Sequence, residues 1–162
     1  MTLERLWAGW RAGYIETVVT APAADECLFC ILARSDDDEA QILARDDLVY
    51  AVLNAYPYTS GHLMVVPVRH EERLDALTAD EAGAVMAMTQ RATAAVQAAY
   101  RPEGINVGIN LGRAAGAGVP GHLHIHVVPR WLGDTNFMTS VAETRVLPEP
   151  LSRSCERLRS EW

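Results

Sequence analysis

Five short runs of mainly hydrophobic residues in this chain are predicted to be strands, and the last two alternate with polar or small residues. The first two are rich in β-branched and aromatic residues and are separated by Asp46 and Asp47, which favour a turn. Pro67 lies near the end of the third run, where it indicates a sheet edge or a bulge. The five predicted strands are residues 41–45, 48–54, 61–68, 104–112 and 122–130.

A helical period of hydrophobic residues separates the third and fourth strands. Thr78 and Glu81 have the spacing of a capping box, so the helix is expected to begin at Thr78 and to run to Tyr100. A second helix is predicted from Leu151 to the C-terminus. Antiparallel strands around one long helix predict an α+β domain that spans residues 1–162.

Composition narrows the classes of function. The 162 residues carry a net charge of −7 and a pI of about 5.2, which argues against binding to nucleic-acid polymers but leaves small anionic ligands open. Residues 35–39 (SDDDE) are expected to form a solvated acidic loop. No apolar run suits a signal peptide or a membrane span, and three cysteines suit a reducing compartment, so we expect a cytoplasmic protein without membrane contact.

Three of the five histidines, His122, His124 and His126, occupy alternate positions of the last predicted strand. Successive side chains of a strand point to opposite faces, so the three imidazoles share one face. A purely structural role would bury three polar rings on that face, each at a cost in desolvation. Two chemical interpretations remain at this point: a metal site, and nucleophilic catalysis at phosphorus.

The loop before these histidines favours phosphate chemistry. Residues 110–121 (NLGRAAGAGVPG) contain four glycines, and glycine lets backbone N–H groups approach phosphate oxygens closely. The loop is not a Walker loop, because no Gly-Lys-Ser/Thr follows.

The run HLHIHVV, which starts at His122, resembles the signature of the histidine triad (HIT) superfamily of nucleotide hydrolases and transferases. The segments CLFC, LNAYPYTSGHLMVVPVRH, NLGRAAGAG and WLGDTNFM are similar to one bacterial branch, which includes diadenosine tetraphosphate phosphorylases and hydrolases. The resemblance covers nearly the whole chain. It implies a HIT-like sheet of about five strands and, usually, a two-fold dimer.

The resemblance also implies roles for single residues. His124 would be the nucleophile that forms a nucleotidyl-histidine, and His126 would bind phosphate oxygens and assist the leaving group. The nucleotide-binding residues that it implies are Asn54 for the ribose, Asn110 for the phosphates, Gly118 and Val119 for backbone contacts to the α-phosphate, and His62 as a buttress of the triad.

Cys27 and Cys30 have Cys-x-x-Cys spacing, for which the residues alone leave three interpretations open: a redox pair, two small buried residues, or half of a zinc site. Zinc-bearing relatives carry a histidine at the positions of His70 and His122. The resemblance therefore implies one structural zinc held by Cys27, Cys30, His70 and His122, with Cys155 left as a packing residue.

The most specific function that the resemblance implies is cleavage of diadenosine tetraphosphate by inorganic phosphate. Hydrolysis, a nucleoside phosphoramidase and a non-catalytic zinc-stabilised module that binds adenine nucleotides are the alternatives. A metalloenzyme that uses all three alternating histidines is a further alternative. The aromatic N-terminus, with Trp7, Trp10 and Tyr14, is expected to cover a partner's site or to pack on its own core.

Overall fold

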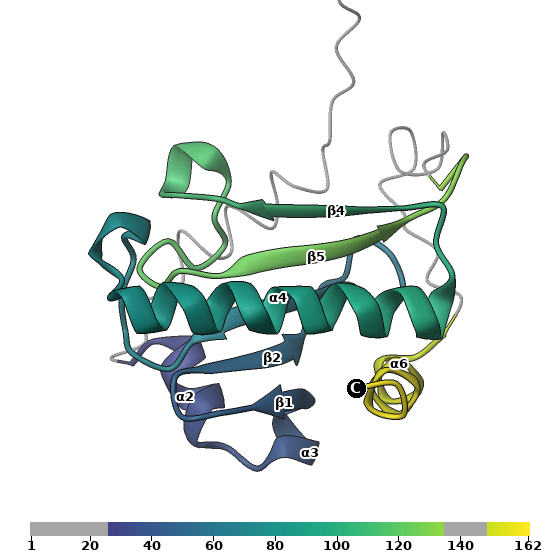
Figure 1. Ribbon diagram of the computed structural model, residues 1–162, viewed down its shortest axis with the longest axis horizontal. Coiled ribbons are helices and arrows are strands. Elements are labelled where there is room, and N and C mark those ends of the chain that lie inside the picture. The colour runs from purple at the N-terminus through teal and green to yellow at the C-terminus, as the bar shows by residue number, and fades with distance from the viewer. Residues whose placement is uncertain (1–25, 135–148) are drawn as a thin grey trace, which may run out of the picture.

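The predicted strands form one antiparallel sheet in the computed structural model, which describes residues 26–134 and 149–162. The strand order is β1-β2-β3-β5-β4, so β1 and β4 are the edges (Figure 1). The strands are β1 (Ile42–Arg45), β2 (Val49–Leu53), β3 (Leu63–Pro67), β4 (Gly104–Ile109) and β5 (Ile125–Arg130).

One face of the sheet is covered by the long helix α4 (Ala79–Tyr100), which lies between the third and fourth strands as predicted (Figure 1). Thr78 and Glu81 form the expected capping box. Helix α6 (Leu151–Arg159) packs beside α4, and its Cys155 and Leu158 join the main core. The α+β architecture and the C-terminal helix are therefore confirmed.

The other face of the sheet has a smaller core around Phe29 of helix α2 (Leu28–Arg34). Tyr50 and Val52 of β2 and Met64 of β3 pack there, because they alternate with the β2 and β3 residues that face α4. This face is the one on which the candidate site is built.

The acidic segment is exposed to solvent, as expected, but it is not a loop. Residues Asp37–Ala40 form the short helix α3, because the Asp36 carboxylate accepts hydrogen bonds from the N–H groups of Asp38 and Glu39. The Asp37 carboxylate also pairs with Arg45, so part of its charge is neutralised. The expected loop is wrong because composition alone does not show this cap.

All five strands are shorter than predicted, and β4 and β5 lose the most at a single end. β4 ends at Ile109 rather than at residue 112, and β5 begins at Ile125 rather than at His122. The chain between them contains the 3₁₀ turn η2 (Arg113–Ala115), and a second 3₁₀ turn, η1 (Leu74–Ala76), precedes α4. The residues at the end of β4 and at the start of β5 therefore belong to the connection between these strands and not to the sheet.

Some predictions fall outside the described residues. These are the packing of Trp7, Trp10 and Tyr14 and the part of the WLGDTNFM segment that follows Asp134. Across residues 26–134 and 149–162, every helix is too short or too polar to cross a membrane.

Candidate nucleotide site and metal cluster

The three alternating histidines lie where β5 approaches β3. Only His126 belongs to β5, opposite Met64 of β3, whereas His122 and His124 lie in the extended segment that leads into the strand. The Leu123 N–H donates to the Glu71 carbonyl at 2.7 Å, which fixes this segment outside the ladder. The alternation still holds, because Ile125 and Val127 enter the core under α4 while the His124 ring packs on Phe29 on the other face.

The tautomer of His122 follows from its partners. Its ring is only 1% exposed, and its Nε2 lies 2.9 Å from the Pro67 carbonyl, which can only accept a hydrogen bond. Nε2 therefore carries the proton, and Nδ1 presents a lone pair. Nδ1 lies 3.3 Å from the Cys27 sulfur and 3.7 Å from the Cys30 sulfur. Burial lowers the pKa of His122, which favours this neutral form.

A second histidine completes a cluster of four. His70 Nδ1 lies 3.4 Å from the Cys30 sulfur, and the ligand atoms of Cys27, Cys30, His70 and His122 all lie within 4.8 Å of one another. Tetrahedral zinc with ordinary Zn–S and Zn–N bonds would separate its ligand atoms by about 3.3–3.8 Å. The three sulfur–nitrogen distances given above, 3.3, 3.4 and 3.7 Å, fit that range, so these residues fit a closed Cys₂His₂ zinc site.

The Cys30 thiol would ionise at neutral pH only with a cation beside it. Burial, followed by the nearby Cys27, raises the pKa of the Cys30 thiol in the protein alone. Two adjacent thiolates need a positive charge to be stable, and a metal ion supplies it.

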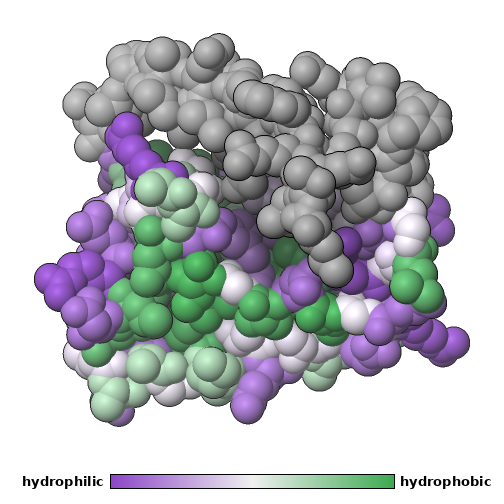
Figure 2. All heavy atoms as spheres, turned by 90° about the horizontal axis from the view of Figure 1, so that it is seen from above, coloured by the Kyte–Doolittle hydropathy of each residue, from purple (hydrophilic) through white to green (hydrophobic). Residues whose placement is uncertain are grey.

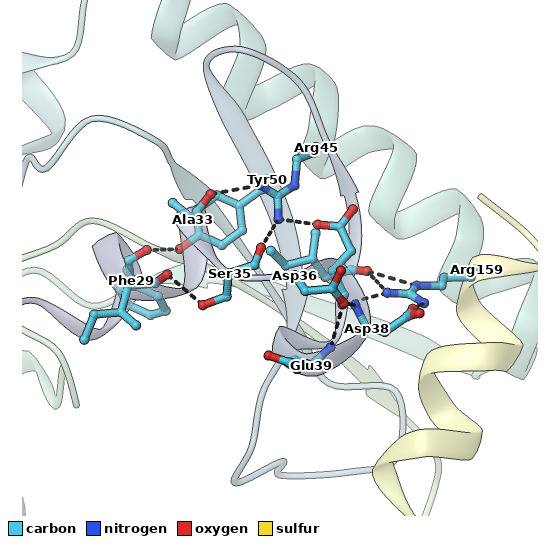
Figure 3. A network of polar contacts seen from close by, with 12 residues as sticks. Phe29, Ala33, Ser35, Asp36, Asp38, Glu39, Arg45, Tyr50 and Arg159 are labelled. Atoms are coloured by element: carbon cyan, nitrogen blue, oxygen red, sulfur yellow. Dashed lines mark hydrogen bonds and ion pairs between the residues drawn. The ribbon is translucent and has the colours of Figure 1, made fainter.

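Helix α2, which begins directly after Cys27, is fastened to the sheet by polar contacts (Figure 3). The Tyr50 hydroxyl donates to the Phe29 carbonyl at 2.7 Å, and Arg45 donates to the carbonyls of Ala33 and Ser35 at 2.8 and 3.1 Å. These contacts fix the Phe29 ring, which lies edge-on to His122 at 5.5 Å and tilted against His124 at 5.0 Å between ring centroids.

His124 presents the opposite nitrogen from His122. Its Nδ1 lies 2.8 Å from the His122 carbonyl, so Nδ1 carries the proton and Nε2 has the lone pair. The ring is 3% exposed, and burial lowers the pKa of His124. A neutral imidazole with one fixed, unprotonated nitrogen is the form that nucleophilic attack requires.

His126 receives its tautomer through His62. The Tyr58 N–H donates to His62 Nδ1 at 3.1 Å, so His62 Nε2 carries the proton and donates to His126 Nδ1 at 3.0 Å. His126 in its neutral form is therefore protonated at Nε2, as a hydrogen-bond donor. His62 is fully buried, and the Tyr58 ring lies tilted against it with 4.6 Å between centroids.

The remaining residues of the predicted nucleotide site are less tightly placed. Asn54 follows β2, and its Oδ1 accepts from the Tyr56 N–H at 2.9 Å, so it caps a turn. Its Nδ2 lies 3.4 Å from His62 Nδ1, which brings it beside the histidines. Asn110 is half-buried after β4, and the structure shows no side-chain hydrogen bond between it and any described residue.

The loop between β4 and β5 uses two of its four glycines for backbone freedom. Gly112 and Gly116 have φ angles of 78° and 90° on either side of η2. Gly118 and Val119 follow, half-buried, and Val119 packs against the Phe29 core. A cavity of about 600 Å³ opens between η2 and η1, lined by Leu111, Gly112, Pro120 and residues 72–75.

Three contributors to this site were not singled out from the sequence. Phe29 lies inside the Cys-x-x-Cys motif, and an aromatic residue between two metal ligands is the signal that could have identified it. The Pro67 carbonyl and the Tyr58 N–H are backbone groups, so no side-chain pattern reveals them.

Comparisons with known proteins agree with this arrangement. The HIT domain family matches residues 35–131. AP-4-A phosphorylase of Mycobacterium tuberculosis is 42% identical over 165 residues, which cover 99% of this chain and 85% of that protein. The asymmetrical bis(5'-nucleosyl)-tetraphosphatase of Schizosaccharomyces pombe is 32% identical over 95 residues, 59% of this chain and 52% of that protein.

Among solved structures, a Zn-bound histidine triad family protein from Mycobacterium smegmatis is similar, with a TM-score of 0.68 and 29% identity. The match covers 84% of this chain and 92% of that one. A HIT family protein from Bacillus anthracis matches with a TM-score of 0.60 and 32% identity over 67% of this chain and 76% of that one.

Proposed function

Because this chain belongs to the HIT family and is an enzyme of its nucleotidyltransferase and hydrolase class, we propose that it cleaves dinucleoside polyphosphates through a nucleotidyl-His124 intermediate. The specific reaction that we propose is phosphorolysis of diadenosine tetraphosphate. The relative of that activity, 42% identical over 99% of this chain, supports the choice of substrate.

The observation that carries the proposal is the contact between His124 Nδ1 and the His122 carbonyl, at 2.8 Å. It leaves the Nε2 lone pair for attack on the α-phosphorus. In the first step a P–N bond forms at Nε2 while the bond between the α-phosphorus and its bridging oxygen breaks, and ATP leaves.

His126 serves the leaving group in this mechanism. Its Nε2–H, assigned through His62, donates to the bridging oxygen as negative charge develops there. Backbone groups of Gly118 and Val119 bind the α-phosphate, Asn110 contacts the phosphates, and Asn54 binds the ribose hydroxyls.

The second step reverses the geometry of the first. An oxygen of inorganic phosphate attacks the same phosphorus, the P–N bond breaks, and ADP is released with His124 regenerated. If water is the attacking group, the product is AMP and the enzyme is a hydrolase.

Zinc has a structural role in this proposal. Cys27, Cys30, His70 and His122 would fill all four positions of a tetrahedral ion, which would leave no position open for substrate. The ion would supply positive charge to the two thiolates and join α2 to the segments that carry His70 and His122. His124 would remain outside the metal shell, as the nucleophile.

Product analysis tests the function directly. With diadenosine tetraphosphate and inorganic phosphate, we expect ADP and ATP, with formation of ADP strictly dependent on phosphate. His124→Asn should lower kcat by about 10⁴-fold or more, because it removes the nucleophile. Radiolabel from the adenylyl group should remain with the wild-type protein after an alkaline quench, in which the P–N bond to histidine is stable, and be absent from the variant.

The control is Arg153→Gln on α6, an exposed change far from the histidines, which should keep full activity. AMP and ATP as the products would replace phosphorolysis by hydrolysis. Nucleotide binding without turnover of diadenosine tetraphosphate or an adenosine phosphoramidate would overturn the catalytic proposal in favour of a binding module.

We also propose that the chain forms a homodimer in the cytoplasm, with small nucleotides as its ligands. β4 is an edge strand with Val107 50% exposed, and Figure 2, which looks down on this side of the molecule, shows hydrophobic side chains gathered there. Such an edge favours pairing with a second copy. Sedimentation equilibrium that finds only monomers at micromolar concentration would contradict this assembly.

A further inference from the structure

Positive charge is scarce around the histidines. The chain contains no lysine, so all of its 14 cationic side chains are arginines, against 21 acidic residues. A substrate with several phosphates brings a large negative charge to an acidic protein, and imidazole donors alone compensate little of it. The arginines that remain available for phosphate therefore decide where a polyphosphate can lie.

Most of the described arginines are already engaged. The guanidinium of Arg91 lies over the Trp162 ring. Carboxylates of described residues pair with Arg34, Arg45, Arg69, Arg73, Arg130, Arg157 and Arg159. Within the described ranges, this leaves Arg101, Arg113 and Arg153 with neither an ion pair nor an aromatic ring beneath the guanidinium.

Two of these three lie away from the glycine-rich loop. Arg101 ends α4, and β4 starts nearby at Gly104, opposite Arg130, whereas the loop leaves β4 at the other end, where Ile109 faces Ile125. Arg153 belongs to α6, which packs on α4 and β1 at the opposite face from Phe29 (Figure 1). Arg113 alone belongs to the loop that leads into the histidines.

The backbone around Arg113 is well defined. It opens η2, with Gly112 and Gly116 in positive-φ conformations on its two sides, and its carbonyl accepts from the Gly116 N–H at 2.9 Å. The side chain is exposed. A guanidinium offers five donors in a fixed fork that matches phosphate oxygens, so an unpaired arginine here suits a phosphate group.

We propose that Arg113 forms a subsite for the distal phosphates of a dinucleoside polyphosphate, those beyond the α-phosphate held at His124. The proposal rests on the proposed function and adds to it the recognition of the leaving nucleotide. Arg113 binds the charge that distinguishes a polyphosphate chain from a substrate with one phosphate.

The neighbouring cavity does not provide this subsite. Its lining includes the Glu72 carboxylate, and the Arg73 guanidinium there is already bound to Asp75 at 2.6 and 3.0 Å. A phosphate in the cavity would face an unpaired carboxylate, whereas on the Arg113 side of η2 it faces an unpaired cation. The distal phosphates therefore lie on Arg113.

Calorimetric titration tests the subsite without requiring turnover. The probes are diadenosine tetraphosphate and AMP. Each is titrated into His124→Asn, in which the ligands stay intact, and into the double variant that also carries Arg113→Gln. We expect the Kd for the tetraphosphate to rise about 10- to 100-fold and the Kd for AMP to change less than about twofold. Arg113→Lys should recover part of the loss, because the point charge remains.

Arg153→Gln is the matched control, since it removes an exposed, unpaired arginine elsewhere and should leave both Kd values unchanged. An unchanged tetraphosphate Kd in Arg113→Gln overturns the proposal, and equal weakening of AMP also overturns it, because Arg113 would then contact the α-phosphate. If the wild type binds the tetraphosphate through Arg113 but never cleaves it, the proposed function fails while the subsite stands.

Discussion

At the scale of single residues, backbone groups decide which nitrogen each imidazole presents. The Pro67 carbonyl fixes the proton of His122 on Nε2, and the His122 carbonyl fixes the proton of His124 on Nδ1. His126 is set indirectly, because His62 donates to it only while the Tyr58 N–H donates to His62. Within five residues, three imidazoles thus present different groups: His122 a lone pair on Nδ1, His124 a lone pair on Nε2, and His126 an Nε2–H donor.

His62→Leu should therefore act through His126. Without the Nε2–H donor of His62, the proton of His126 is no longer fixed at Nε2, so kcat for diadenosine tetraphosphate should fall about 10²-fold. The loss should be much smaller for the p-nitrophenyl ester of AMP, whose leaving group needs little assistance. His62→Gln, whose amide can still donate, should recover part of the activity.

Nitrogen-15 NMR of the His126 ring separates this role from simple loss of folding. The wild type should show Nε2 protonated and Nδ1 unprotonated, and His62→Leu should show a mixture of tautomers in an otherwise native spectrum. Equal losses on both substrates with an unchanged His126 signal would argue for a packing role only.

At the residue scale, the side chains that lie together could largely be predicted from the sequence. Alternation places His122, His124 and His126 on one face. The resemblance to HIT proteins implies that Cys27, Cys30, His70 and His122 form one metal site, and the structure brings these four residues together. The tautomers could not be predicted, because backbone groups fix them, directly or through His62, and the positions of those groups depend on the fold.

At the scale of elements, the N-terminus of α4 is tied to the loop that carries His70. The Glu81 side chain caps the helix at Thr78 and also binds Arg69 at 2.6 and 2.8 Å. Arg69 contacts Glu71 as well, and the Glu71 carbonyl accepts from the Leu123 N–H. Through Arg69 and Glu71, the helix is therefore linked to the segments that carry His70 and His122.

Folding stability should depend on pH through Glu81. The hydrogen bonds from Arg69 and from the Thr78 N–H lower the pKa of Glu81 from its ordinary 4.5 to about 2. The stabilisation is complete above pH 4.5 and is lost as the pH falls from 4.5 towards 2, where the carboxylate becomes protonated in the native state. Denaturant melts of Glu81→Gln should thus show a flatter dependence on pH across that range.

The wild type and the variant should approach each other in stability at pH 2 and differ most at pH 5 to 7. Asp80→Asn is a suitable control, because Asp80 is an exposed carboxylate in the same first turn of the helix. Parallel pH profiles for the wild type and Glu81→Gln would refute this assignment.

Elements were predicted well where a periodic pattern has a local cause. The capping box at Thr78 and Glu81 is local, and the structure contains it. Helix α3 was missed because it depends on a cap at Asp36 and on Arg45 and Arg159, one of which lies more than a hundred residues away in sequence. Similarly, β5 loses its first residues because Leu123 pairs with Glu71 outside the sheet.

At the scale of the whole molecule, the two faces of the sheet differ in how much apolar core they carry. α4 and α6 cover one face with the main apolar core, whereas the other face carries only the small core around Phe29. The metal cluster lies on this thin side. Cys27 directly precedes α2 and Cys30 lies within it, whereas His70 follows β3 and His122 precedes β5.

Loss of the metal should therefore destabilise the fold, beyond any effect on catalysis. We expect one zinc ion per chain, and removal by a chelator should lower Tm by about 10 °C or more. Cys27→Ser and Cys30→Ser should each lose the zinc and melt at the temperature of the chelated wild type. Elemental analysis and thermal melts measure both effects.

Cys155→Ala is the control, because Cys155 is buried between α6 and α4 and lies outside the cluster. It should retain a full equivalent of zinc. If His124→Asn lost the zinc while Cys27→Ser kept it, a metal site on the alternating histidines would replace the one described above.

The spacing of the alternating histidines also limits how this chain can lengthen over evolution. An extra residue in the exposed turn of residues 46–48, between β1 and β2, would only enlarge that turn. An extra residue between His122 and His126 would rotate one imidazole towards α4. His122 could then no longer face the two cysteines while His124 faces the phosphorus. Natural insertions and deletions should accordingly collect in the turn and be purged from the five positions that follow Gly121.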